Sequence, residues 1–101
     1  MDLAQTAEKL KEKMAFAPHI KAKVVFDFGD EGTIYIDSTQ SPAEISNDNP
    51  DDADVRLITS LSTFEGFLNG SKDPNIAFMM GQLKVKGSMS LALKLNAVLE
   101  D

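Results

Sequence analysis

The side chains that most often carry catalysis are scarce in this chain of 101 residues, which has one histidine and no cysteine. Thiol nucleophiles, disulfides and histidine-based metal sites are therefore excluded. A Ser-His-Asp triad would have to use His19, which follows Pro18 where a helix is expected to give way to a strand. A solvated or capping histidine is the simpler interpretation there, so we expect no catalytic residue.

An acidic segment over residues 47–54 suggests a calcium loop, because carboxylate and amide oxygens are calcium ligands. An EF-hand loop starting at Asn47 would need glycine where Asp52 stands and glutamate where Ile58 stands. Charge runs between elements are usually solvated turns. The segment therefore predicts an acidic turn and no metal site.

The segment from Gly81 to Ser88 suggests a phosphate-binding loop, since glycines and a lysine precede a helix. The Walker motif needs four residues between its glycines and a lysine after the second. Here five residues separate Gly81 from Gly87, and Lys86 precedes the second glycine, so nucleotide hydrolysis is excluded. Lys86 could still attract an anionic head group beside the last helix, although a solvent-facing strand lysine is the simpler interpretation.

Charge limits the partners further. Sixteen acidic and ten basic residues give a net charge of −6, which excludes nucleic acid and disfavours a stable position on anionic membranes. No apolar run is long enough to span a bilayer, and transient membrane contact is allowed. Neither end carries a signal peptide, prenylation motif or organelle address, which predicts a cytoplasmic protein.

Apolar spacing predicts the elements that must position any site. Helical spacing and capping residues predict helices over residues 2–14, 62–70, 74–81 and 88–99, with capping at Asp2, Ser62, Asp73 and Ser88. Alternation of apolar and polar residues predicts strands over residues 20–28, 33–37, 43–46, 53–59 and 83–86. Only Val25 breaks this alternation. The order αβββ and then β-α-α-β-α predicts one α+β domain over residues 1–101.

The last third of the chain holds more apolar residues than one small core needs. The last helix has one apolar face, around Leu91, Leu95, Val98 and Leu99, that can pack on a sheet. A second apolar stripe lies nearly opposite, so this helix must be buried on two faces by a ligand, a partner or a membrane. We expect a soft lining of phenylalanine, methionine and small apolar residues: Phe64, Phe67, Phe78, Met79, Met80, Met89, Leu93 and Ala97.

Several segments resemble the sterol carrier protein type two family, also called nonspecific lipid-transfer proteins. The most specific is Ala-Phe-Met-x-Gly-x-Leu-Lys-x-x-Gly-x-Met over residues 77–89, and Ala53–Leu57, Leu68–Gly70 and Asp73-Pro74 extend the resemblance. The resemblance implies a five-stranded mixed sheet covered on one face by helices, with a hydrophobic tunnel between them. It also implies binding of sterols, fatty acids or acyl-CoA without catalysis. Thr33-Ile34-Tyr35 stands where the family often has an aromatic residue opening the second strand.

We therefore expect a non-catalytic intracellular carrier of a fatty acid, fatty acyl-CoA, sterol or isoprenoid, with no cofactor. The alternative is an interaction module whose last helix docks on a partner enzyme of lipid or quinone metabolism, or on a second copy. Exposure of Met89, Leu93 and Ala97 in the monomer would favour that alternative.

Overall fold

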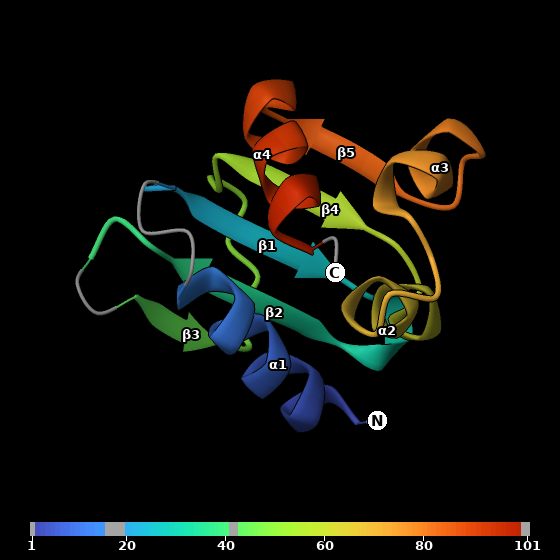
Figure 1. Cartoon of the computed structure of the whole chain (residues 1–101). Helices are drawn as coiled ribbons and strands as arrows, with labels where there is room; N and C mark the ends of the chain where they lie inside the picture. Colours follow the sequence, from blue (N-terminus) through green and yellow to red (C-terminus); the bar gives the residue numbers. More distant parts are fainter. Residues whose placement is uncertain (1, 16–19, 41–42, 100–101) are drawn as a thin grey trace.

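The computed structural model describes residues 2–15, 20–40 and 43–99. Figure 1 shows a sheet with helices gathered on one of its faces. The helices are α1 (Leu3–Ala15), α2 (Leu61–Leu68), α3 (Pro74–Met79) and α4 (Met89–Leu99), with a 3-10 turn at Gly29–Glu31. The strands are β1 (Lys23–Asp27), β2 (Thr33–Asp37), β3 (Glu44–Ser46), β4 (Val55–Ile58) and β5 (Lys84–Gly87).

The five strands lie in the order β3-β2-β1-β4-β5. The central strand β1 pairs antiparallel with β2 and parallel with β4, so the sheet is mixed. The remaining pairs, β2 with β3 and β4 with β5, are antiparallel. This arrangement confirms the predicted α+β class with helices on one face.

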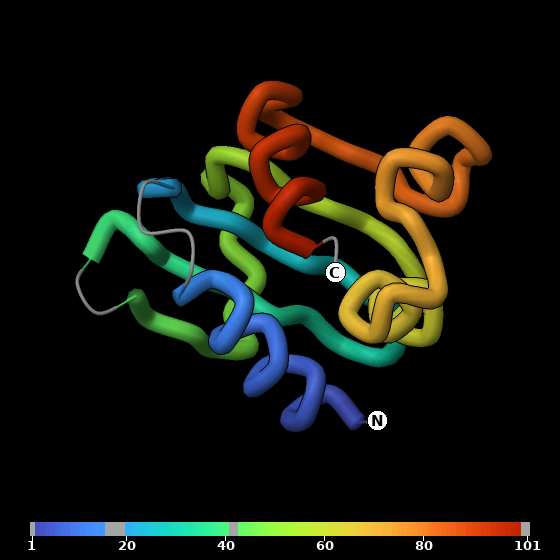
Figure 2. The backbone as a smooth tube through the Cα atoms, viewed as in Figure 1, coloured from blue at the N-terminus to red at the C-terminus, as the bar shows by residue number. Residues whose placement is uncertain are grey.

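The acidic segment connects two parallel strands across the back of the sheet. Residues 47–54 leave β3 and reach β4 by passing β2 and β1 on the face away from the helices (Figure 2). Arg56 holds this connection: its Nη1 donates to Asn49 Oδ1 at 2.6 Å and its Nη2 to the Pro50 carbonyl at 2.9 Å. Among the described residues, no group of three His, Cys, Asp or Glu side chains could hold a metal ion.

Val25 breaks the predicted alternation because its strand is buried on both faces. Val24 and Phe26 face the helices, whereas Val25 points to the other face and is nevertheless fully buried. Central strands with a parallel neighbour are commonly covered on both sides and read as continuous apolar runs. Val25 points to the face of the sheet that residues 47–54 cross, and no helix of the described residues lies on that face (Figure 2).

The core lies between the helices and the front face of the sheet. The Phe64 ring packs 5.3 Å from that of Phe26 and 6.0 Å from that of Phe67, measured between centroids. Such tilted and edge-on pairs add to the free energy gained by burial. The N-terminal helix buries Thr6, Leu10 and Met14 against this core.

Three of the four predicted helix caps are confirmed. Asp2 Oδ1 accepts from the Gln5 amide, Asp73 Oδ1 from the Asn75 amide and Ser88 Oγ from the Leu91 amide. The fourth, at Ser62, is wrong: Ser60 Oγ accepts from the Thr63 amide and α2 begins at Leu61. Because β4 already ends at Ile58, the cap lies two residues earlier than predicted, at Ser60. Pro18 and His19 lie outside the described residues.

Gly87 joins the last strand to the last helix through a close backbone approach. Its φ is +96°, and a Cβ there would lie 2.5 Å from the Asp54 carbonyl oxygen. The following Ser88 amide donates to that same oxygen at 3.0 Å. The geometry therefore requires glycine, and it fixes where α4 begins relative to β4.

Candidate functional site

The large exposed apolar side chains of the described residues gather on two elements. They are Ile76, Phe78 and Met79 on α3, Met80 directly after α3, and Met89 and Leu93 on α4. We call these six residues the α3–α4 patch. Met79 is 78% exposed and Leu93 is 57% exposed, which is unusual for such side chains when they cluster.

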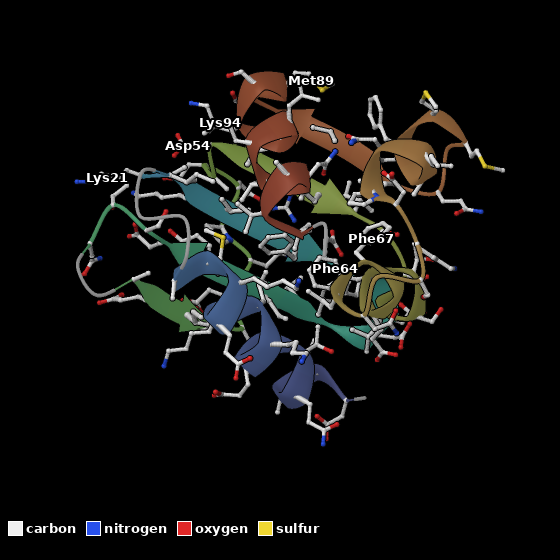
Figure 3. All side chains as sticks on the ribbon, viewed as in Figure 1. Lys21, Asp54, Phe64, Phe67, Met89 and Lys94 are labelled. Atoms are coloured by element: carbon white, nitrogen blue, oxygen red, sulfur yellow. The ribbon has the colours of Figure 1, made fainter. Side chains whose placement is uncertain are left out.

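A side-chain hydrogen bond places the two halves of the patch next to each other. Asn96 Nδ2 on α4 donates to Asn75 Oδ1 on α3 at 3.1 Å. Met89, Leu93 and Asn96 stand at i, i+4 and i+7, so they share one side of α4. That side is therefore the one turned toward α3. Figure 3 agrees, since Met89 points up on the α3 side of α4 whereas Lys94 points away from α3.

Helix α3 is attached to the rest of the protein over a small area. It has six residues, of which only Pro74 and Ala77 are buried. Asp73 caps its start, and Gly81 at φ +78° turns the chain at its end. A short element with few buried apolar contacts belongs to the least stable part of a fold. The α3 half of the patch is therefore held to the rest of the fold by few buried side chains.

The structure divides the predicted site residues into two groups. Phe64 and Phe67 are buried in the core, where Figure 3 shows both reaching from α2 toward α4. The second group is exposed and lies on or directly after α3 and on α4: Phe78, Met79, Met80, Met89, Leu93 and Ala97. Ile76 and Asn96 join this region although the sequence analysis did not include them. The spacing of Ile76 from Met79 and Met80, at i+3 and i+4, could have identified the first.

The chain itself buries α4 on one face, so the expected burial of a second face by a ligand, a partner or a membrane stays a prediction. Met89, Leu93 and Ala97 are exposed, and the buried residues of α4 are Ala92, Leu95, Asn96 and Leu99. Leu91 and Val98 are only partly buried. The buried face packs against β4 and α1, and Asn96 stands at its edge, where it contacts α3. The second apolar stripe remains open to solvent.

Lys86, the cation considered for an anionic head group, lies away from the patch. Lys86 pairs across the sheet with Arg56, and directly opposed residues share a face. Arg56 contacts the crossing segment, so Lys86 also points to the back of the sheet. This placement contradicts the anionic head-group interpretation of Lys86.

The two groups with shifted pKa values both lie on β2. Hydrogen bonds from Thr39 lower the pKa of Asp37, and burial raises the pKa of Tyr35. Strand β2 is separated from β5 by β1 and β4.

Comparison with known proteins identifies the family. The model of the SCP-2 sterol transfer family matches residues 2–100. The chain belongs to the SCP-2 sterol transfer family. This membership confirms the resemblance that residues 77–89 carry, and the family is one of lipid binding and transfer.

The curated relatives that this SCP-2 family member matches are much longer than the chain. Hydroxysteroid dehydrogenase-like protein 2 of Bos taurus is 38% identical over 71 residues, which are 69% of this chain and 17% of that protein. The chain thus matches only a small part of its curated relatives.

Solved structures show the same fold. The apo form of sterol carrier protein 2 from Yarrowia lipolytica has a TM-score of 0.68 and 28% identity, covering 97% of this chain and 78% of that one. Palmitated sterol carrier protein 2-like 2 from Aedes aegypti has a TM-score of 0.73 and 17% identity, covering 100% of this chain and 96% of that one. In the described part of this chain, no helix is both long enough and apolar enough to cross a membrane.

Proposed function

We propose that this SCP-2 family member is a non-catalytic cytoplasmic carrier that takes up one long-chain lipid through the α3–α4 patch. The candidate cargoes are a fatty acid, a fatty acyl-CoA, a sterol or an isoprenoid. The observation that carries the proposal is the exposure of six large apolar side chains on two adjacent helices. A solvent-facing cluster of this kind marks a binding surface rather than a core.

The arrangement of the helices supports an entry path. Few buried contacts hold α3, so its displacement from α4 would open the space behind the patch. Phe67 reaches toward that space from α2 (Figure 3). The hydrophobic tunnel implied by the family would then run beneath α4, from the exposed methionines to Phe64 and Phe67. Methionine suits such a path because its flexible side chain adapts to different lipids.

Transfer energetics predict modest affinity. Burying ~12 methylenes at ~0.8 kcal/mol each gives roughly 10 kcal/mol. Lost freedom on binding costs at least ~4 kcal/mol, which leaves ~6 kcal/mol or less and a Kd of tens of micromolar or weaker. A carrier with this affinity releases its load readily and discriminates weakly between chain lengths.

A second candidate function rests on the same exposure. Met89, Leu93 and Ala97 are open to solvent, as an interaction module docking on a partner enzyme or a second copy requires. Sedimentation of the lipid-free protein tests this alternative. A concentration-dependent dimer that Leu93→Glu dissociates would favour it, whereas a monomer at all concentrations favours the carrier over self-association.

Lipid binding is tested in two steps. Native mass spectrometry of the freshly purified protein should show a fraction carrying one co-purified lipid. The delipidated protein should then bind a pyrene-labelled lipid, delivered from cyclodextrin, with about 1:1 stoichiometry. Absence of both the lipid adduct and saturable binding up to roughly 100 μM, in protein that circular dichroism shows to be folded, would contradict the carrier function.

A further inference from the structure

Asn96 carries a buried polar atom that the fold does not satisfy. The residue is 3% exposed, and its Oδ1 is the one buried side-chain oxygen or nitrogen in the described residues without a hydrogen-bond partner. Its Nδ2 is already used, donating to Asn75 Oδ1 at 3.1 Å. An unpaired buried acceptor costs folding free energy and normally has a reason.

Asn96 lies at the inner edge of the α3–α4 patch. Asn96 follows Leu93 by three residues and Met89 by seven, so the three share the side of α4 that faces α3. Leu93 is 57% exposed whereas Asn96 is buried, which orders them from the surface inward. A lipid that enters between α3 and α4 therefore passes Leu93 before it meets the amide of Asn96.

We propose that Asn96 determines ligand specificity, its Oδ1 accepting a hydrogen bond from the hydroxyl group of a neutral lipid. This inference rests on the proposed carrier function and narrows its cargo to a long-chain alcohol or a sterol-like hydroxyl lipid. The ligand hydroxyl keeps its proton and donates it in a hydrogen bond, so no covalent bond forms or breaks.

The chemistry of the acceptor explains the preference. A hydroxyl supplies the donor that Oδ1 lacks, whereas an ether of the same chain supplies none and leaves the acceptor unpaired. A carboxylate would place its negative oxygen against another acceptor, and burying its charge without a cationic partner is costly. Lys86, the cation considered for a head group, points to the other face of the sheet. The net charge of −6 also opposes an anionic ligand.

A comparison of three ligands tests this preference in the full chain. Hexadecanol, hexadecyl methyl ether and palmitate each compete with the pyrene-labelled probe for the wild-type protein at neutral pH. We expect hexadecanol to bind about tenfold more tightly than the ether, and more tightly than palmitate. In Asn96→Leu, which keeps the branched shape of the side chain without its polar atoms, alcohol and ether should bind equally. Lys94→Gln, on the side of α4 that points away from α3 (Figure 3), should keep the preference.

Each other result overturns the inference. Equal binding of alcohol and ether to the wild type, or tighter binding of palmitate, would show that Oδ1 selects no hydroxyl. A preference that persists in Asn96→Leu would assign it to another group. If Asn96→Leu fails to fold, the wild-type comparison still decides. Failure of all three ligands to displace the probe would contradict the carrier function itself, which distinguishes that failure from a lack of selectivity.

Discussion

Asn96 Nδ2 donates a hydrogen bond to Asn75 Oδ1 at 3.1 Å, and this contact joins the last helix to the short helix before β5. Asn96 is buried, but Asn75 stands on a helix that buries only Pro74 and Ala77. The bond thus connects a firmly packed helix to a weakly packed one. It connects the α3 half of the α3–α4 patch to the α4 half.

Breaking this contact should loosen α3 alone. In Asn75→Ala we expect faster amide hydrogen exchange over residues 77–83, since α3 loses its polar contact with α4. Exchange in β1 and β4 should stay unchanged. Lys94→Gln on the outer side of α4 is the control. Uniform acceleration across the sheet would mean that Asn75 supports the whole fold.

Two leucines on α4 should differ sharply in their contribution to stability. Leu95 is fully buried, so Leu95→Ala should lower the free energy of unfolding by ~2–5 kcal/mol. Leu93 is 57% exposed, so Leu93→Ala should change it by no more than ~0.5–1 kcal/mol. Urea midpoints of the two variants measure the difference. Similar losses would mean that Leu93 is covered in solution.

Gly87 and Gly81 both have a positive φ, so replacing each with alanine compares the loss of stability with and without a steric contact. Gly81→Ala strains the backbone at φ +78° but meets nothing within 4 Å. Gly87→Ala adds a contact of 2.5 Å with the Asp54 carbonyl oxygen at φ +96°. We expect the Gly81 change to cost ~1 kcal/mol and the Gly87 change at least ~1 kcal/mol more. Equal thermal unfolding of the two variants would contradict the close approach.

Asp37 should contribute to the acid sensitivity of the fold. The Thr39 hydroxyl, the Thr39 amide and Gln40 donate to its carboxylate, which lowers its pKa in the folded state. A carboxylate with a lowered folded pKa stabilises the protein above its unfolded pKa of about 3.9, and this contribution is lost as pH falls through the folded value. Asp37→Asn should therefore show a shallower loss of stability below about pH 4. An NMR titration should show the pKa of Asp37 rising in Thr39→Val.

Local patterns predicted most of this fold because each element follows its own periodicity. Leu10 and Met14 face the core as their helical spacing requires, and Ile34 and Ile36 point inward as alternation requires. The residues 47–54 were harder to predict, since nothing local indicates that an acidic turn crosses the back of a sheet. That crossing depends on the strand order, which brings β4 beside β1.

The candidate site was predictable in composition but not in arrangement. The sequence identified the apolar surplus on the last three helices, yet it could not separate Phe64 and Phe67 in the core from Met79 and Met80 on the surface. Burial depends on how α3 and α4 pack, and that packing includes a contact between two asparagines distant in sequence. Asn96 is a polar residue on α4, and nothing in its sequence position indicates that it is buried.

The account depends most directly on whether lipid binds at the α3–α4 patch. Leu93→Glu and Lys94→Gln each lower the net charge by one. Leu93 shares the side of α4 that carries Asn96 and its bond to α3, whereas Lys94 points away from α3 (Figure 3). Both should fold as well as wild type, because both positions are exposed. Titration with the pyrene-labelled lipid should show at least about tenfold weaker binding for Leu93→Glu and unchanged binding for Lys94→Gln. A folded Leu93→Glu protein that binds lipid as well as Lys94→Gln would contradict the placement of the site.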